Sequence, residues 1–180
     1  MLGRTHLVIG VAMVVAADGT VGFVQPHSGS GLAVGPFLCL GLAMVGSLAP
    51  DIDAEASVLR GSSRILGLVS TTLRGVGLTH RGLTHSGLAA LMVMLLSLAA
   101  GGWLGGLDLG LAFGLGYAGH IIADAATVRG VPLLWPRPGR FHLLPRSLRV
   151  RTGGTAENVV LIGLCLGLLP IIPLWLAKFG

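Results

Sequence analysis

The chain alternates long apolar stretches with shorter polar loops. Five stretches, at residues 7–24, 32–49, 87–104, 109–128 and 159–178, carry at most one charged residue each. Each approaches the length of about 20 apolar residues that lets a helix cross a bilayer. Lipid offers the backbone no hydrogen-bond partners, so a spanning segment has to satisfy its own, as a helix does. The pattern therefore predicts an all-α, polytopic membrane helix bundle with about five spanning helices.

The first stretch is the weakest, because Asp18 and Gly19 interrupt it. Two interpretations are open for it, a signal peptide cleaved after Ala17 or a retained helix. Arg4 is the only charged residue before the stretch, and four further apolar stretches follow it. Both observations favour the retained helix. A further element is expected in the 51–86 loop, where apolar residues alternate with arginines over residues 57–76. This alternation is typical of a helix that lies in the membrane interface.

The composition separates this chain from ordinary soluble proteins. Hydrophobic residues make up 53% of it and charged residues 11%, whereas soluble domains have about 25% charged residues. The mean hydropathy is +0.86. Glycine is frequent, at 30 of 180 residues, and glycine lets membrane helices approach each other closely. We therefore expect residues 1–180 to form a single integral membrane domain.

The net charge of +5 is distributed unevenly along the chain. If five spans alternate, eleven of the 12 basic residues fall on one side of the membrane, and only Lys178 lies on the other. Basic residues mark the cytoplasmic side of membrane proteins, which predicts a cytoplasmic N-terminus. Because these residues border apolar segments, membrane lipid is the expected partner and nucleic acid is not.

Imidazoles and carboxylates cluster on that same predicted side. They begin the first span, follow the second, precede the third and end the fourth. Such groups are costly at membrane depth unless they pair, face water or hold a cation. The candidate metal ligands are His6, Asp51, Asp53, His80, His85, His120 and Asp124. His120 and Asp124 are four residues apart, so on a helix they project from one face.

The kinds of ligand indicate the kind of ion. Histidine and aspartate without thiolate suit Zn²⁺, Mn²⁺ or Fe²⁺ better than Ca²⁺, which prefers oxygen alone. Seven candidates exceed what a single tetrahedral ion needs. We therefore expect two divalent ions, with zinc as first choice and manganese or iron as alternatives. Paired ions can activate a bridging hydroxide for attack on a phosphoester.

These motifs, in this order, resemble those of the YdjM-type inner-membrane metal-dependent hydrolases. The matching motifs are Thr5-His6, the run from Leu48 to Asp53 with Ser57, the run from His80 to Ser86, the run from Gly116 to His120 with Asp124 and Thr127, and the run from Gly130 to Pro136. The resemblance covers most of the chain. It implies a bacterial or archaeal inner-membrane protein with a hydrolase site distantly similar to those of zinc phospholipase C and P1 nuclease. It also implies that the seven candidates above are the metal ligands.

Asp53 and Arg81 are the candidate catalytic residues. Arg81 would either hold a substrate phosphate in bidentate fashion or pair with Asp51 or Asp53 behind the metal. Glu157 matches a late acidic element of the family, and it would equally serve as a carboxylate at a helix start. The sequence leaves both choices open.

The leading hypothesis is a membrane-embedded, metal-dependent hydrolase, phosphoesterase- or phospholipase-like, at the cytoplasmic membrane surface. Its substrate would be a phosphoester of a lipid or lipid-like molecule, attacked by a metal-bridging hydroxide. The alternatives are a metal ion transporter or sensor that uses the same ligands, and a purely structural metal clasp. Transport would require polar residues that continue toward the far face, where we identify only Asp18 and His27. That asymmetry favours catalysis.

Overall fold

The computed structural model describes residues 1–27, 34–51 and 82–179. Over these ranges the fold is all-helical, without a β-strand, which confirms the predicted class. The α-helices are α1 (Gly3–Val21), α2 (Gly35–Leu48), α5 (Gly87–Trp103), α6 (Leu107–Ala125) and α7 (Thr155–Leu176). Each covers one of the five apolar stretches, and their ends agree to within four residues. The apolar stretches in the sequence therefore located the five helices.

Two of the helices are long and apolar enough, by length and composition, to cross a membrane. They are α1 and the segment Thr155–Phe179, in which α7 continues into the 3-10 turn η4 (Ala177–Phe179). The segments Gly35–Asp51 and Gly87–Trp103 are shorter apolar helices. This test supports two of the five predicted spans.

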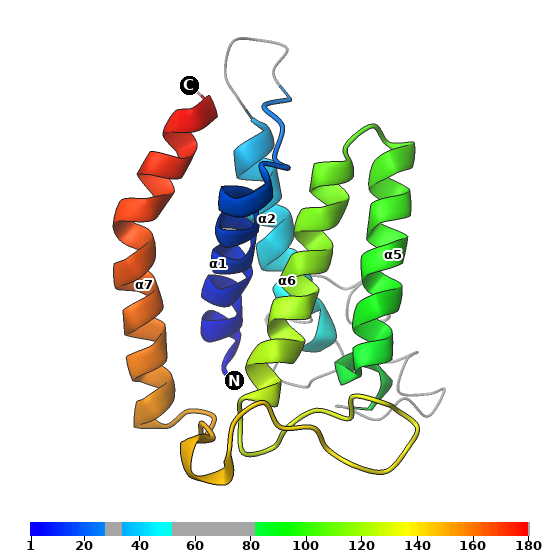
Figure 1. The fold of residues 1–180 in the computed structure, drawn as a ribbon, viewed down its shortest axis with the longest axis vertical. Helices are drawn as coiled ribbons and strands as arrows, with labels where there is room; N and C mark the ends of the chain where they lie inside the picture. Colours follow the sequence, from blue (N-terminus) through cyan, green and yellow to red (C-terminus); the bar gives the residue numbers. More distant parts are fainter. Residues whose placement is uncertain (28–33, 52–81, 180) are drawn as a thin grey trace, which may run out of the picture.

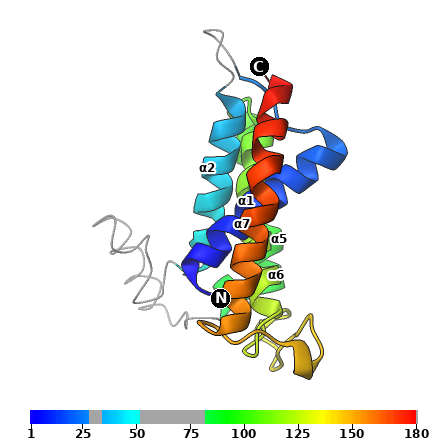
Figure 2. The same cartoon turned by 90° about the vertical axis from the view of Figure 1, so that its left-hand side faces the viewer.

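Helix α6 is the central helix of the bundle. It packs against α1, α2 and α5, whereas α7 lies at one edge and packs against α1 (Figures 1 and 2). Successive helices run in opposite directions, so the chain returns repeatedly to the end at which the N-terminus lies (Figure 1). We call this the N-terminal end. It gathers the start of α1, the end of α2, the start of α5, the end of α6 and the start of α7.

Glycines set the distance between α6 and its neighbours. A methyl group at Gly116 would lie 2.1 Å from the carbonyl oxygen of Ala43 in α2, and one at Gly46 would lie 2.2 Å from the carbonyl oxygen of Phe113. Neither position has room for a side chain, so the backbones of α2 and α6 approach directly. Small residues allow this approach in membrane bundles, where dispersion rather than the hydrophobic effect holds helices together.

We expect Gly116→Ala to destabilise the protein by about 1–3 kcal/mol, because the added methyl group would push α2 away from α6. Gly163→Ala is the matched control, since a methyl group at Gly163 in α7 meets no atom within 4 Å. It should leave stability unchanged or raise it slightly through better helix propensity. Thermal unfolding in detergent measures both variants. Equal stability of the two would contradict the packing described here.

The opposite end of the bundle is closed by two buried carboxylates. Asp18 accepts hydrogen bonds from the backbone N–H of Val24 and from Trp175 Nε1, both at 2.7 Å. Asp108 accepts one from the backbone N–H of Gln25 at 3.0 Å and pairs with His27 Nε2 at 2.8 Å. These contacts hold the segment after α1 and the edge helix α7 in place.

Candidate metal centre

Five of the seven candidate ligands converge at the N-terminal end. His6 lies in the first turn of α1, and Asp51 ends the 3-10 turn η1 (Ala49–Asp51) that follows α2. His85 ends the 3-10 turn η2 (Leu83–His85) that precedes α5, and His120 and Asp124 lie near the end of α6. The ligands thus come from four parts of the chain that are distant in sequence.

The side chains of Asp51 and His85 meet the imidazole of His120. The Nε2 atom of His85 lies 3.2 Å from Asp51 Oδ1 and 3.3 Å from His120 Nε2. His120 Nε2 itself lies 3.9 Å from Asp51 Oδ1. Two imidazole nitrogens and a carboxylate oxygen therefore point toward one small volume.

His6 and Asp124 complete the cluster on its inner side. The rings of His6 and His120 stack with their centroids 3.7 Å apart. His6 Nε2 lies 3.4 Å from Asp124 Oδ1, and His120 Nε2 lies 4.0 Å from Asp124 Oδ2. The N-terminal ammonium of Met1 also donates to Asp124.

Two overlapping groups have the spacing of a cation site. One is His6, Asp51 and His120, and the other is His85, His120 and Asp124. In each group, one potential ligand atom per residue lies within 4.8 Å of the others. All these residues are buried except Asp51, whose side chain is 21% exposed. Asp51 is therefore the ligand through which the cluster contacts its surroundings.

The tautomer of His120 follows from its surroundings. Its Nδ1 atom lies 2.7 Å from the backbone carbonyl oxygen of Ser47 in α2, and a carbonyl only accepts hydrogen bonds. Nδ1 therefore carries the proton, and the lone pair of Nε2 points into the cluster. A histidine metal ligand is commonly fixed in this way by a carbonyl behind it. Sequence analysis missed the role of Ser47, because nothing in a sequence marks a backbone carbonyl as an orienting group.

His6 supplies a second sign that the cluster suits a cation. Its side chain is fully buried, yet neither ring nitrogen makes a hydrogen bond. Buried polar atoms are nearly always paired, and leaving one unpaired costs about 1–3 kcal/mol. The nearest polar contact of this ring is Asp124 Oδ1, 3.4 Å from Nε2, and a buried ring nitrogen that faces a carboxylate in this way has the environment of a metal ligand. The donor set of the cluster thus fits the predicted divalent ions.

Local sequence explains how the two ligand-bearing turns form. Pro50 follows α2 within η1, so that Asp51 leaves the helix axis. Ser86 caps α5, accepting a hydrogen bond from the N–H of Ala89 at 3.0 Å. The hydroxyl of Tyr117 donates to the carbonyl of Thr84 at 2.5 Å and holds η2 against α6.

The environment of Asp51 keeps it ionised. Burial raises the pKa of its carboxyl, but the opposing effects, of which the hydrogen bond with His85 is the largest, outweigh burial and hold the pKa below its ordinary value. Asp51 therefore presents the carboxylate form that binds cations.

Glu157 has a structural place beside the cluster. Its Oε1 atom accepts hydrogen bonds from the backbone N–H of Leu2 at 2.6 Å and from the hydroxyl of Thr5 at 2.7 Å. Its Oε2 atom accepts one from the backbone N–H of Gly153 at 2.7 Å. Glu157 thus connects the start of α7 to the turn of α1 that carries His6.

Three predicted site residues and one predicted element lie outside the described residues. They are Asp53, His80, Arg81 and the interfacial helix over residues 57–76. Their roles stay predictions.

Comparison with known proteins supports the family that the motifs indicated, whereas the hydrolase activity and the similarity to zinc phospholipase C and P1 nuclease stay predictions. The model of the YdjM inner membrane protein family matches residues 1–176. The chain belongs to the YdjM family. The uncharacterized protein YvsG of Bacillus subtilis (strain 168) is 31% identical over 166 residues, which cover 92% of this chain and 91% of that protein. The inner membrane protein YdjM of Escherichia coli (strain K12) is 41% identical over 103 residues, and that of Shigella flexneri gives the same figure.

The match with the two YdjM proteins covers 56% of this chain and 50% of each of them. No solved structure matches the chain. Membership of the YdjM family makes this a membrane protein and supports the predicted location in a bacterial inner membrane.

Proposed function

We propose that this member of the YdjM family is a metal-dependent hydrolase that acts on a phosphoester of a lipid or lipid-like molecule at the cytoplasmic membrane surface. The observation that carries the proposal is the buried His120 imidazole. The Ser47 carbonyl fixes its tautomer, so that the unprotonated Nε2 atom faces Asp51, His85 and Asp124.

The cluster offers ligands for two divalent ions. His6, Asp51 and His120 would hold one, and His85, His120 and Asp124 would hold another; zinc is the first choice and manganese or iron are alternatives. Bound ions would polarise a phosphoryl oxygen and favour ionisation of an attacking water. Asp53, His80 and Arg81 remain candidates for completing the site. Among the candidate ligands that the structure describes, Asp51 is the most exposed, so it faces the side from which a substrate would enter.

The charge pattern supports the proposed orientation. The helices alternate in direction, and the cluster and the arginine-rich loop after α6 lie at the same end (Figure 1). In a bundle that crosses the membrane five times, this end carries the positive charge and faces the cytoplasm. The cluster would then lie near the depth of the lipid headgroups.

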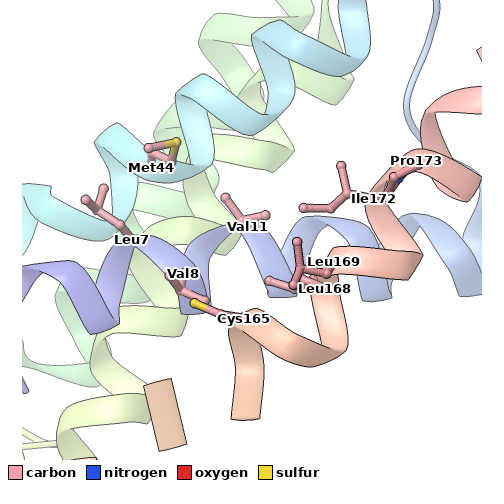
Figure 3. Close-up of a pocket in the computed structure, with 9 residues that line it drawn as sticks. All are labelled: Leu7, Val8, Val11, Met44, Cys165, Leu168, Leu169, Ile172 and Pro173. Carbon is pink, nitrogen blue, oxygen red and sulfur yellow. The ribbon is translucent and has the colours of Figure 1, made fainter. Parts of the chain in front are cut away.

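An apolar groove supports a substrate with a hydrocarbon chain. Side chains of α1, α2 and α7 line this cavity of about 530 Å³, which is shown in Figure 3. Its lining is entirely apolar apart from the thiol of Cys165. Leu7 and Val8 line it, and they directly follow His6 in α1. A lipid whose phosphate lies at the cluster would have an apolar surface for its acyl chain close by.

Helix packing argues against the alternative of a metal transporter. Beyond the cluster, α2 and α6 are in backbone contact at Gly46 and Gly116. At the opposite end, the carboxylates of Asp18 and Asp108 are engaged by Trp175, His27 and backbone N–H groups. A path for an ion between the two ends would have to break this packing.

Removal of metal should abolish hydrolysis. Purified protein in nanodiscs is treated with a chelator, dialysed and mixed with mixed-lipid vesicles, and phosphate-containing products are measured with and without added Zn²⁺ or Mn²⁺. We expect turnover to fall at least about 100-fold on chelation and to return when the metal is restored. The reason is that a bound ion would polarise the phosphoryl group and favour ionisation of the attacking water.

The control is protein dialysed without chelator, with metal content measured in every sample. Zinc or manganese flux into vesicles, with no hydrolysis of any phospholipid, would establish the transporter instead. Bound metal with neither flux nor hydrolysis would establish a structural clasp.

A further inference from the structure

A second site of a different chemical kind lies at the N-terminal end of the bundle. The segment after α6 forms an open surface hollow of about 730 Å³, lined by Val128, Arg146, Ser147, Arg149 and Arg151, of which Arg146 and Arg151 are exposed. Three of the five lining residues are therefore arginines. In the sequence these arginines indicated only which side of the membrane the loop occupies, and orientation alone does not require them to share a cavity.

The arginines are held on a fixed backbone. Val128 donates a backbone hydrogen bond to the carbonyl of Val150, and Val150 donates one to the carbonyl of Ala126, both at 3.0 Å. Val150 is buried in a small apolar cluster with Met1 and Ala123. Because side chains alternate along extended backbone, anchoring Val150 inward turns its neighbours Arg149 and Arg151 outward.

Among the described residues, no carboxylate neutralises the arginines that line this hollow. No acidic residue occurs between Asp124 and Glu157, although the segment holds six arginines. Within the described ranges, no carboxylate pairs with Arg146, Arg149 or Arg151. Arg149 is also oriented, because its Nε atom donates to the carbonyl of Leu144 at 3.1 Å. An oriented guanidinium beside two others is a ready receptor for an anion.

The basic residues of this segment indicate the chemical class of the ligand. All six basic residues of this segment are arginine and none is lysine. Attraction to a charged membrane surface needs only positive charge, which lysine supplies equally well. Arginine adds a planar fork of donors that matches two oxygens of one phosphate group. Eleven of the 12 basic residues of the whole chain are arginine, so this choice is not particular to the segment; what it provides here is a set of guanidinium forks that suit a phosphate group.

The hollow is also connected to the metal centre. Thr127, the neighbour of Val128, donates through its hydroxyl to the carbonyl of Asp124 at 2.7 Å. The backbone that carries the candidate ligand Asp124 therefore continues directly into the lining of the hollow.

We propose that Arg146, Arg149 and Arg151 form a phosphate-binding site. Its ligand is the phosphate group of an anionic lipid headgroup or free phosphate. The inference deepens the proposed function, and it rests on that function only for the idea that a phosphate-bearing substrate is used. The site would hold a phosphate group at the same end of the bundle as the metal centre and thereby select anionic substrates.

The test measures phosphate binding by chelator-treated protein, so it is independent of hydrolysis. Calorimetry with inorganic phosphate is one arm. Competition by bicelles of phosphatidylcholine, with and without phosphatidate, is the other. The variant is Arg149→Lys with Arg151→Lys, which keeps the charge and removes both forks. The control is Arg137→Lys, which changes an exposed arginine of the same segment that does not line the hollow.

We expect the double variant to weaken phosphate binding at least about tenfold and the control to change it less than twofold. Stronger binding of phosphatidate than of inorganic phosphate would identify a lipid headgroup as the ligand, and equal binding would identify free phosphate. Equal affinity of the double variant and wild type, or no saturable binding by wild type, would overturn the site. Loss of hydrolysis on chelation with phosphate binding retained leaves both proposals standing. Phosphate binding by a protein that hydrolyses nothing refutes only the proposed function.

Discussion

The Asp51→Asn variant is expected to lose bound metal and hydrolysis together. The substitution keeps the shape of the side chain and removes the charge that faces His85 and His120 at 3.2 and 3.9 Å. Loss of residues that merely orient metal ligands costs about 10–100-fold in affinity, so loss of a ligand should cost at least the upper end of that range. Elemental analysis and phospholipid turnover, measured on the same preparation, provide the test.

The fold of the variant should survive, because Asp51 is partly exposed at the end of α2. Asp108→Asn is the matched control, since it neutralises a carboxylate that also pairs with a histidine but lies at the opposite end. It should keep both metal and turnover. His120→Ala should reproduce the loss seen with Asp51→Asn. Turnover by metal-free Asp51→Asn protein would refute the assignment of the site.

The Glu157→Ala variant is expected to show the largest loss of stability. It would leave three donors, the N–H groups of Leu2 and Gly153 and the hydroxyl of Thr5, without their acceptor. Each unsatisfied buried donor costs about 1–3 kcal/mol. Because water can reach the more exposed Leu2 and Gly153, we expect a total loss near the low end, about 3 kcal/mol. Thermal unfolding in detergent measures this loss.

Asn158→Ala is the control for Glu157. Asn158 is the next residue of α7 and accepts an exposed hydrogen bond from Arg4 at 2.9 Å, so its loss should change stability by less than about 0.5 kcal/mol. Glu157→Ala should also weaken metal binding, because Thr5 precedes His6 in α1. Wild-type stability of Glu157→Ala would show that the connection between α1 and α7 does not hold the fold together.

The position of the helices was predictable because it depends on local properties of the chain. An apolar run of sufficient length forms a helix whatever its neighbours are, and alternation of such runs brings the intervening loops to two ends. That reasoning placed His6, Asp51, His85, His120 and Asp124 at one end, where they lie. Helix boundaries were less accurate, and α1 and α7 begin four residues before the predicted spans. A pattern of apolar residues does not include the polar residues with which these helices begin, so it places their starts too late.

The contacts at the opposite end of the bundle were not predicted from the sequence. In the sequence, Asp18 and His27 stood out only as polar residues toward the far face, and Asp108 was not singled out. In the structure, Asp18 is buried against Trp175, and Asp108 pairs with His27. These contacts join residues that are 157 and 81 positions apart. A local pattern cannot reveal such pairings, because they depend on how the helices pack.

The sequence by itself determined a helical membrane protein, its helices, and the set of imidazoles and carboxylates at one end. Those features follow from composition and spacing, which act over a few residues. Three other features became visible only in the folded chain: the Ser47 carbonyl fixes the His120 tautomer, Glu157 joins α1 to α7, and three arginines share one hollow. Each of these depends on distances between atoms far apart in the chain, and packing of the helices sets those distances.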